Sequence, residues 1–266
     1  SSGLVGSEMC IRDRLKELGY LKKSVSISTL EKSSFFKAKT KSLSEKIKQK
    51  EIGIIAEHKR RSPSKSKINY QTPSKSIIKG YDNGGAAGIS FLTEKNFFGG
   101  SSVEFTEARR ITNLPMLRKD FIIDEYQIIE SKSIGADAIL LIAACLNSSQ
   151  IKNLSKLAKS FDLEVLIEIH DLEELNKVCI DSIDIIGINN RNLKTFDVNI
   201  ETSLNLVEKI PSSFTKISES GLNNPSEIMK LKNSGFDGFL IGERFMRNSN
   251  PGEELSNFIS KIKNES

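Results

Sequence analysis

The stretch AILLIAA at residues 138–144 is apolar at every position, and it decides the fold class of the chain. A strand that is buried on both faces has this composition, which favours a parallel sheet wrapped by helices. Seven further short runs resemble it, and helix-like stretches separate one run from the next. In chain order, the eight runs are IGIIAEHK (52–59), GISFLTE (88–94), PMLRKDF (115–121), AILLIAA (138–144), EVLIEI (164–169), IIGINN (185–190), TKISES (215–220) and GFLIGE (238–243).

Eight strand–helix units in about 200 residues predict an α/β fold, a (β/α)8 TIM barrel with an N-terminal helical extension. A barrel of this kind places its chemistry at the C-terminal ends of the strands. The polar residues at those ends are therefore the candidates for a site: Glu57, Lys59, Lys119, Glu168, Asn189, Arg191, Glu219 and Ser220.

Three regions follow from the pattern. Residues 1–14, SSGLVGSEMCIRDR, show no helical period, and we interpret them as a non-native or disordered segment. Residues 15–50 are rich in lysine and serine, with apolar residues at helical spacing, and are expected to form one or two helices. Residues 51–266 contain all eight runs and are expected to form a catalytic barrel, with no low-complexity linker inside it.

Composition limits the class of partner. The chain is 38% hydrophobic, and no apolar stretch reaches the roughly 18 residues of a membrane span, so no membrane is expected. The net charge of +5 is spread over helical segments, which we interpret as solvated faces; attraction of an anionic small molecule is the alternative. The cluster Lys59-Arg60-Arg61 is too short for a nucleic-acid footprint.

Cysteine and histidine positions predict neither a disulfide framework nor a metal site. Cys10, Cys145 and Cys179 fit no zinc spacing, and His58 and His170 are not spaced as a ligand pair. We expect no cofactor. With few thiols and no recognisable signal peptide, we expect a reducing, cytoplasmic environment.

The first candidate motif is AEHKRRSPSK at residues 56–65. Glu57 and Lys59 are two residues apart in a strand and so point to the same face, which is the barrel interior. A charge there is costly unless it is paired or used, so the pair indicates a site, with a structural ion pair as the alternative. Ser62 begins a polar loop whose conformation is restricted by proline.

The second motif is LRKDF at residues 117–121. Lys119 and Phe121 share one face of the strand, and Arg118 and Asp120 share the other. A lysine that points into a confined site is expected to have a lowered pKa and to act as a proton donor.

Strands five and six offer further candidates. Glu168 has apolar neighbours on both sides, which argues against a surface position; its alternative role is to pair with a buried lysine. His170 follows this strand, and we interpret it as structural. Asn189 and Arg191 alternate onto one face and offer amide hydrogen bonds and a guanidinium group to a carboxylate or to hydroxyls.

Two turns of small residues follow the seventh and eighth strands, at Ser220-Gly221 and Gly242-Glu243. Small residues let backbone N–H groups approach a phosphate at the N-terminus of a helix. Paired turns at these two positions of an eightfold barrel predict a phosphate site. The side chain of Glu243 must then point away from the anion.

These motifs closely resemble those of the indole-3-glycerol phosphate synthase family of tryptophan biosynthesis. The resemblance covers about residues 30 to 263 and rests on AEHKRRSPSK, LRKDFIIDEYQI, GADAILLIAA, EVLIEIHD, GINNRNL, SESGL and FLIGERFM. It implies a decarboxylating ring closure and dehydration of 1-(2-carboxyphenylamino)-1-deoxyribulose 5-phosphate to indole-3-glycerol phosphate. A small phosphorylated substrate is thus expected, and partner enzymes of the pathway are possible.

The resemblance also implies roles for single residues. It implies catalytic roles for Glu57, Lys59, Lys119, Glu168, Asn189 and Ser220, with Lys119 as the general acid. It implies substrate binding by Ser62, Phe121, Arg191, Leu193, Glu219, Gly221, Leu240, Gly242 and Glu243. His58, where the family commonly has an apolar residue, and Ser66, where a glycine is usual, depart from the pattern.

Two alternatives remain at this point. One is another phosphate-binding barrel, such as a sugar-phosphate isomerase or the tryptophan synthase α subunit. The other is a barrel without catalytic activity that binds a partner. This second alternative predicts that Glu57, Lys119 or Glu168 is missing, and all three are present.

Overall fold

Eight parallel strands form a closed barrel in the computed structural model, which describes residues 5–63, 65–192 and 195–265. Each strand pairs with its neighbours in chain order, and β1 pairs with β8, so the predicted barrel is confirmed. The strands are β1 (Gly53–His58), β2 (Gly88–Leu92), β3 (Met116–Lys119), β4 (Ala138–Ile142), β5 (Glu164–Ile169), β6 (Ile185–Asn189), β7 (Thr215–Glu219) and β8 (Gly238–Ile241).

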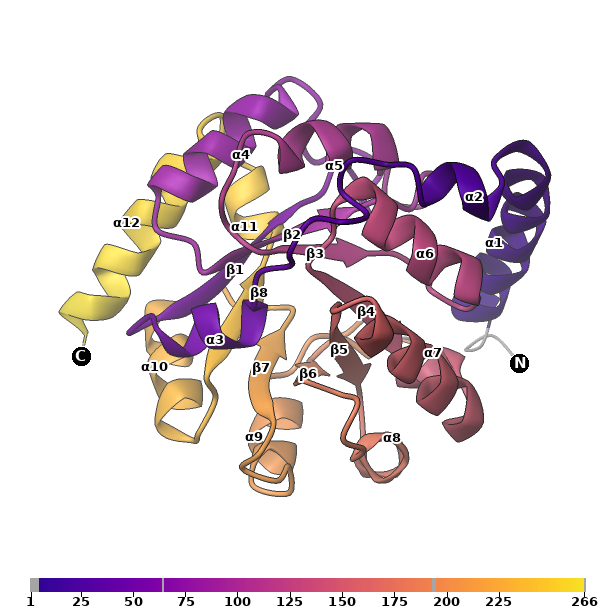
Figure 1. Cartoon of the computed structure of the whole chain (residues 1–266). Helices are drawn as coiled ribbons and strands as arrows, with labels where there is room; N and C mark the ends of the chain where they lie inside the picture. The colour runs from indigo at the N-terminus through magenta and orange to yellow at the C-terminus, as the bar shows by residue number, and fades with distance from the viewer. Residues whose placement is uncertain (1–4, 64, 193–194, 266) are drawn as a thin grey trace.

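Helices surround the strands, and Figure 1 shows them as a ring around the barrel. The helices within the barrel region are α4 (Ser74–Asn83), α5 (Ser102–Arg109), α6 (Glu125–Ile134), η1 (Ala143–Cys145), α7 (Ser148–Ser160), α8 (Leu172–Val178), α9 (Glu201–Val207), α10 (Pro225–Asn233), α11 (Glu243–Met246) and α12 (Pro251–Asn264). Three helices precede β1: α1 (Val5–Ser24), α2 (Ile27–Leu30) and α3 (Leu43–Lys48).

Side chains alternate between two cores along each strand. Ile55, Leu117 and Leu166 belong to a fully buried cluster inside the barrel. Their neighbours Ile54 and Met116 belong to the larger cluster between the strands and the helices. Because the period of a strand is two, the inward positions continue to the polar residues at the strand ends.

Helix α3 closes the N-terminal end of the barrel. Its Leu43 and Ile47 are fully buried and join the interior cluster. The Glu164 carboxylate of β5 caps the helix, accepting hydrogen bonds from the backbone N–H of Leu43 at 2.7 Å and of Ser44 at 2.9 Å. Gly238 at the start of β8 leaves room for Ile47, since a Cβ there would lie 2.7 Å from its Cγ2.

Helix α1 crosses the boundary that we drew at residue 14 from the sequence. It begins at Val5, inside the segment that we interpreted as non-native or disordered. Tertiary contacts that a local period cannot reveal hold this helix. Arg14 donates to Asp120, which follows β3, at 2.8 Å, and Lys22 pairs with Asp124 at 2.7 Å. In Figure 1, α1 and α2 lie outside the ring of helices, beside α6.

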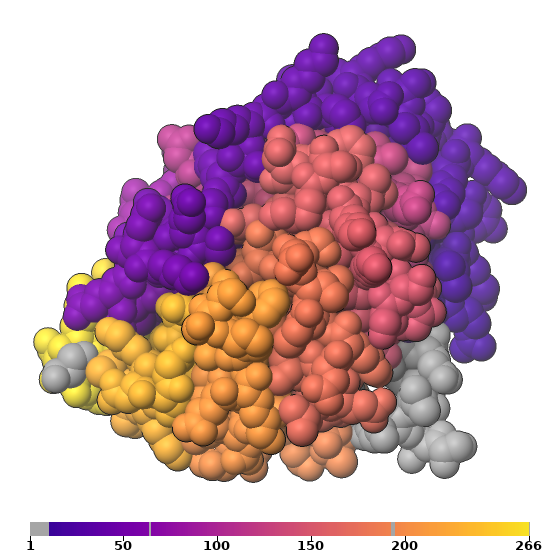
Figure 2. All heavy atoms as spheres, turned by 60° about the horizontal axis from the view of Figure 1, so that its bottom comes forward, coloured from indigo at the N-terminus to yellow at the C-terminus, as the bar shows by residue number. Residues whose placement is uncertain are grey.

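The two ends of the barrel region meet at its base. Lys263 of α12 pairs with Glu51, just before β1, at 2.7 Å. Figure 2 shows the yellow C-terminal residues beside the purple residues of the N-terminal third. Among the described residues, no helix combines the length and the apolar character that a membrane span requires.

We predict that Ile47→Ala lowers the free energy of unfolding by about 2–5 kcal/mol, because it leaves a cavity beneath the barrel interior. The measurement is the urea midpoint followed by circular dichroism. Leu15→Ala is the control, since this side chain is 55% exposed and its loss should cost less than about 0.5 kcal/mol. Equal losses in the two variants would contradict a closing role for α3.

Candidate active site

A cavity of about 650 Å³ opens at the C-terminal ends of the strands. Every residue predicted for the site and described by the structure lines it, including Leu240 and Glu243 from the last unit. Leu193 lies outside the described residues. The barrel thus brings together side chains from β1, β3, β5, β6, β7 and β8, although their roles remain predictions.

A cluster of ion pairs occupies the floor of this cavity. The Nζ of Lys119 lies 2.6 Å from a carboxylate oxygen of Glu219, 3.5 Å from Glu168 and 3.9 Å from Glu57. Lys59 pairs with the other oxygen of Glu57 at 2.7 Å. Two ammonium groups therefore neutralise most of the charge of three buried carboxylates.

The pKa of Lys119 contradicts the expectation from the sequence. Burial alone would lower it, but Glu219, Glu168 and Glu57 outweigh burial and raise this pKa above its ordinary value. Lys119 is consequently a cation at neutral pH. It can still donate a proton, but its readiness to do so must come from a change in its carboxylate partners.

The three carboxylates differ in protonation. Burial alone would raise the pKa of Glu57 and of Glu168. Lys59 and Lys119 together hold the pKa of Glu57 below its ordinary value, and Lys119 does the same for Glu168. Burial, together with Glu168 and against Lys119, raises the pKa of Glu219 to about 7. Glu57 and Glu168 are therefore ionised at neutral pH, whereas Glu219 is partly protonated.

Residues of β6 orient the cluster. Asn189 donates from its amide nitrogen to Glu168 at 3.1 Å and accepts from the backbone N–H of Arg191 at 3.0 Å. The guanidinium of Arg191 donates to the carbonyl of Phe196 at 3.0 Å at the cavity rim. Asn189 and Arg191 both line the cavity.

The turn after β7 has an unusual backbone. Ser220 and Gly221 have φ values of 70° and 76°, which is the left-handed region. A side chain at Gly221 would collide with Val198, so this position requires glycine. Asn190 braces the turn by donating to the carbonyl of Ser220 at 3.1 Å and to the hydroxyl of Ser218 at 2.9 Å.

Glu243 carries no uncompensated charge at the mouth of the cavity. Its carboxylate accepts from Lys65 in the β1–α4 loop and from Arg247 just after α11. Two cations therefore hold the carboxylate, which also ties the loop that begins at Ser62 to the turn after β8. An anion bound at Gly242 would not face an unpaired negative charge.

Aromatic side chains form the apolar wall of the cavity. The ring of Phe121 lies 6.3 Å from the ring of Phe98, with both rings at the cavity surface. Phe97 and Phe196 also line it. We did not predict Phe97, Phe98 or Phe196 as lining residues, although the adjacent phenylalanines in NFFGG at residues 96–100 are a signal in a polar loop.

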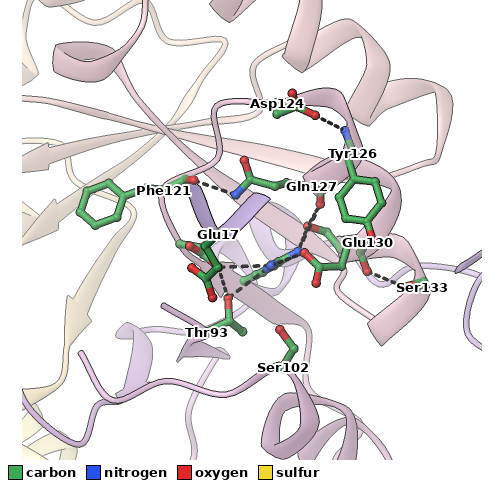
Figure 3. A network of polar contacts seen from close by, with 12 residues as sticks. Glu17, Thr93, Ser102, Phe121, Asp124, Tyr126, Gln127, Glu130 and Ser133 are labelled. Carbon is green, nitrogen blue, oxygen red and sulfur yellow. Dashed lines mark hydrogen bonds and ion pairs between the residues drawn. The ribbon is translucent and has the colours of Figure 1, made fainter. Parts of the chain in front are cut away.

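A buried polar network lies behind Lys119, on the outward face of β3. Arg118 is fully buried and donates to Glu130 of α6 at 2.6 Å and to Asp120 at 3.2 Å. Thr93 donates to Asp120 at 2.6 Å. Figure 3 shows Thr93 and Glu130 in this network, while the ring of Phe121 points away from it. The network fixes the strand that presents Lys119.

The two histidines have different surroundings. His58 points outward, as expected, and stacks on Phe91 with ring centroids 4.2 Å apart; burial lowers its pKa to about 3, so it is neutral. His170 contacts Glu168 and Glu174. No group of three or more His, Cys, Asp or Glu residues in the described part of the chain is arranged to hold a metal ion.

Comparison with known families identifies close relatives. The family model described as indole-3-glycerol phosphate synthase matches residues 7–258. The indole-3-glycerol phosphate synthase of Bacteroides thetaiotaomicron is 42% identical over 252 residues, covering 95% of this chain and 96% of that protein. That of Thermoanaerobacter pseudethanolicus is 46% identical over 219 residues, covering 82% and 84%.

Solved structures share the architecture at low identity. A thiamine phosphate pyrophosphorylase from Pyrococcus furiosus has a TM-score of 0.59 and 16% identity, covering 84% of this chain and 98% of that chain. A structure described as KGPDC from Streptococcus mutans has a TM-score of 0.59 and 12% identity, covering 80% and 98%. At such identities, the likeness concerns the fold alone.

We predict that Glu219→Gln changes how stability depends on pH. The folded pKa of Glu219 is about 7, above its ordinary 4.5, so the acid stabilises the fold below pH about 4.5 and this contribution is lost as pH rises through 7. We expect the free energy of unfolding of the wild type to exceed that of the variant by less at high pH than at low pH. Between pH about 4 and 8, this difference should fall by a few kcal/mol, since one unit of pKa shift corresponds to about 1.4 kcal/mol.

The measurement is urea unfolding at several pH values between about 4 and 8, the range over which this group titrates. The exposed Glu208→Gln is the matched control and should leave the pH dependence unchanged. A difference between wild type and Glu219→Gln that stays constant with pH would contradict the raised pKa.

Proposed function

Because this chain belongs to the indole-3-glycerol phosphate synthase family, we propose that the ion cluster around Lys119 is its catalytic centre. The activity is that of a decarboxylating carbon–carbon lyase of tryptophan biosynthesis. It converts 1-(2-carboxyphenylamino)-1-deoxyribulose 5-phosphate into indole-3-glycerol phosphate, carbon dioxide and water. The observation that carries the proposal is an ammonium group held among three carboxylates at the end of the barrel strands.

Lys119 is proposed as the general acid for ring closure. The ketone oxygen of the substrate must gain a proton while the aryl carbon attacks the ketone carbon. The raised pKa of Lys119 keeps it protonated until substrate arrives. An oxygen that gains negative charge beside Lys119 competes with Glu219 for the ammonium proton, and this competition favours transfer in the transition state.

Lys59 is proposed to hold the substrate carboxylate until carbon dioxide leaves. It is paired with Glu57 at 2.7 Å, so a second carboxylate can share the same ammonium group. Arg191 and Asn189 at the cavity rim are the alternatives for this contact. Arg191 and Asn189 lie at the end of β6, which does not pair with β1, so they and Lys59 can contact different atoms of one substrate.

Glu168 is proposed as the base for the dehydration that follows. Loss of the hydroxyl as water requires an acid at the oxygen and a base for the proton that leaves carbon. The lowered pKa of Glu168 keeps it ionised, and Asn189 fixes one of its oxygens. Lys119 and Lys59 are the candidates for the acid, and Ser220 is proposed to assist from the neighbouring turn.

The turns after β7 and β8 are proposed to bind the substrate phosphate. Ser220 and Gly221 have the left-handed conformation that can direct successive backbone N–H groups toward an anion, and Gly242 directly precedes α11. Compensation of Glu243 by Lys65 and Arg247 supports this assignment. Leu240, beneath this end of the cavity, is proposed to contact the sugar.

The aromatic wall is proposed to receive the anthranilate ring. Phe121 and Phe98 lie at a tilt of 45°, which leaves ring surface exposed to the cavity. Ser62 is proposed to contact the substrate from the loop above. We also propose a cytoplasmic location among the pathway's other enzymes, supported by the low cysteine count of 3.

We predict that Lys119→Met lowers kcat by about 10²–10⁴-fold while substrate still binds, because the variant loses the general acid but keeps the cavity. Formation of the indole product is followed by absorbance, and binding is followed by titration of the inactive variant. Lys156→Met, at an exposed lysine of α7, is the control. A Lys119→Met enzyme with most of the wild-type kcat would remove Lys119 from the mechanism.

We predict that Gly221→Ala weakens binding of both substrate and inorganic phosphate by about tenfold, equivalent to 1.4 kcal/mol. The added methyl group collides with Val198 and displaces the turn. Gly235→Ala is a matched control, since Gly235 also has a left-handed φ of 102° but has nothing near its Cβ. Competitive inhibition by phosphate is the measurement, and equal inhibition of all three proteins would exclude this turn as the phosphate site.

A further inference from the structure

His170 lies directly behind the proposed base. It follows β5 two residues after Glu168, and its Nε2 lies 3.6 Å from Oε1 of that carboxylate. On the other side of the ring, Nδ1 lies 3.1 Å from Oε2 of Glu174 in α8. The backbone N–H of His170 donates to the same oxygen at 2.8 Å, which fixes the ring in place.

The ring is held between two carboxylates, which restricts its protonation. A neutral imidazole has one N–H donor and one bare nitrogen. If Nδ1 carries the proton, the lone pair of Nε2 faces Glu168; if Nε2 carries it, the lone pair of Nδ1 faces Glu174. Only the imidazolium offers a donor to each side, so it alone removes the repulsion.

The ring nitrogen of His170 that faces Glu168, Nε2, makes no hydrogen bond to any other residue that the structure describes. This nitrogen is also buried. Such a group is costly unless it is paired. Glu168 is already bound by Asn189 through Oε1 and faces Lys119 through Oε2, and a movement of a few tenths of an ångström would bring Nε2 into hydrogen-bond distance of Oε1.

We propose that His170 is a positioning residue for the reaction: as an imidazolium, it donates from Nδ1 to Glu174 and from Nε2 to Glu168, and thereby keeps the proposed base oriented and ionised. This inference rests on the proposed role of Glu168. His170 is absent from the cavity lining, so it acts through that carboxylate and does not touch substrate.

The charges that face His170 favour this state. They are Glu168 on its own strand, Glu174 from α8 and Glu219 from β7. Burial alone would lower the pKa of His170, but these carboxylates outweigh burial and raise it above the ordinary value. In turn, after Lys119, His170 is the next largest cause of the lowered pKa of Glu168.

The first test measures the protonation of His170 and of Glu168 in the enzyme without substrate, so it does not depend on catalysis. Nitrogen-15 NMR of wild type at pH 7 should show both ring nitrogens of His170 protonated, with the signal assigned by its loss in His170→Asn. Carbon-13 NMR should show the carboxylate pKa of Glu168 rising by about one unit in His170→Asn, where a neutral amide replaces the cation. A neutral His170 at pH 7, or an unmoved Glu168, would overturn the proposal.

The second test measures how the rate of the reaction depends on pH. In His170→Asn, the acidic limb of the kcat/KM profile should move to higher pH by about one unit, with KM little changed. Glu174→Gln, which keeps the hydrogen bond but removes a charge, should lower the pKa of His170 and move the limb in the same direction by less. A purely structural His170 would reduce stability in both variants and leave the limb in place, contradicting the inference.

The Glu168→Gln variant distinguishes a failure of the proposed function of Glu168 from a failure of the proposed role of His170. If it leaves kcat unchanged, Glu168 is not the base and the proposed function of that residue fails. If kcat collapses while His170→Asn shifts neither the limb nor the Glu168 signal, the failure belongs to His170 alone.

Discussion

The barrel interior must hold charge in a place from which water is largely excluded, and this constraint orders the site. Glu57, Glu168 and Glu219 meet two ammonium groups, which leaves one negative charge too many. The excess is relieved by a proton at Glu219, whose pKa of about 7 follows from burial. Buried ion pairs seldom stabilise a fold more than apolar packing would. We therefore interpret the cluster as maintained for chemistry, with the closed apolar base of the barrel supporting it.

Strand periodicity explains why so much could be predicted. Because side chains alternate strictly along a strand, the inward position of Ile55 implies that Glu57 and Lys59 also point into the barrel. The eight runs thus predicted both the closed barrel and the polar residues at the strand ends that line one cavity. The outward position of His58 followed from the same rule, and its stacking on Phe91 agrees with it.

What the sequence could not predict depends on contacts between distant segments. We expected a lowered pKa for Lys119 because burial is visible in the strand pattern, whereas the three carboxylates that reverse the shift come from other strands. Helix α1 has no strong local pattern, and Arg14 is held by Asp120 across more than a hundred residues. We did not predict Ser90, which donates to Glu57 at 3.3 Å, because it lies in a run of apolar strand residues. We did not predict Asn190 because it lies beside Asn189, the stronger candidate.

The opposite faces of β3 also protect its alignment with the neighbouring strands. A slip by one residue would exchange the two faces of a strand. On β3 it would replace Lys119, beside Glu57, Glu168 and Glu219, with Arg118 and Asp120, whose charges cancel, and it would leave Glu130 without its guanidinium partner. Misaligned forms of this strand are therefore penalised twice by electrostatics, once inside the barrel and once beneath α6. The charges that we propose for the reaction therefore also favour the correct alignment of β3 over a shifted one.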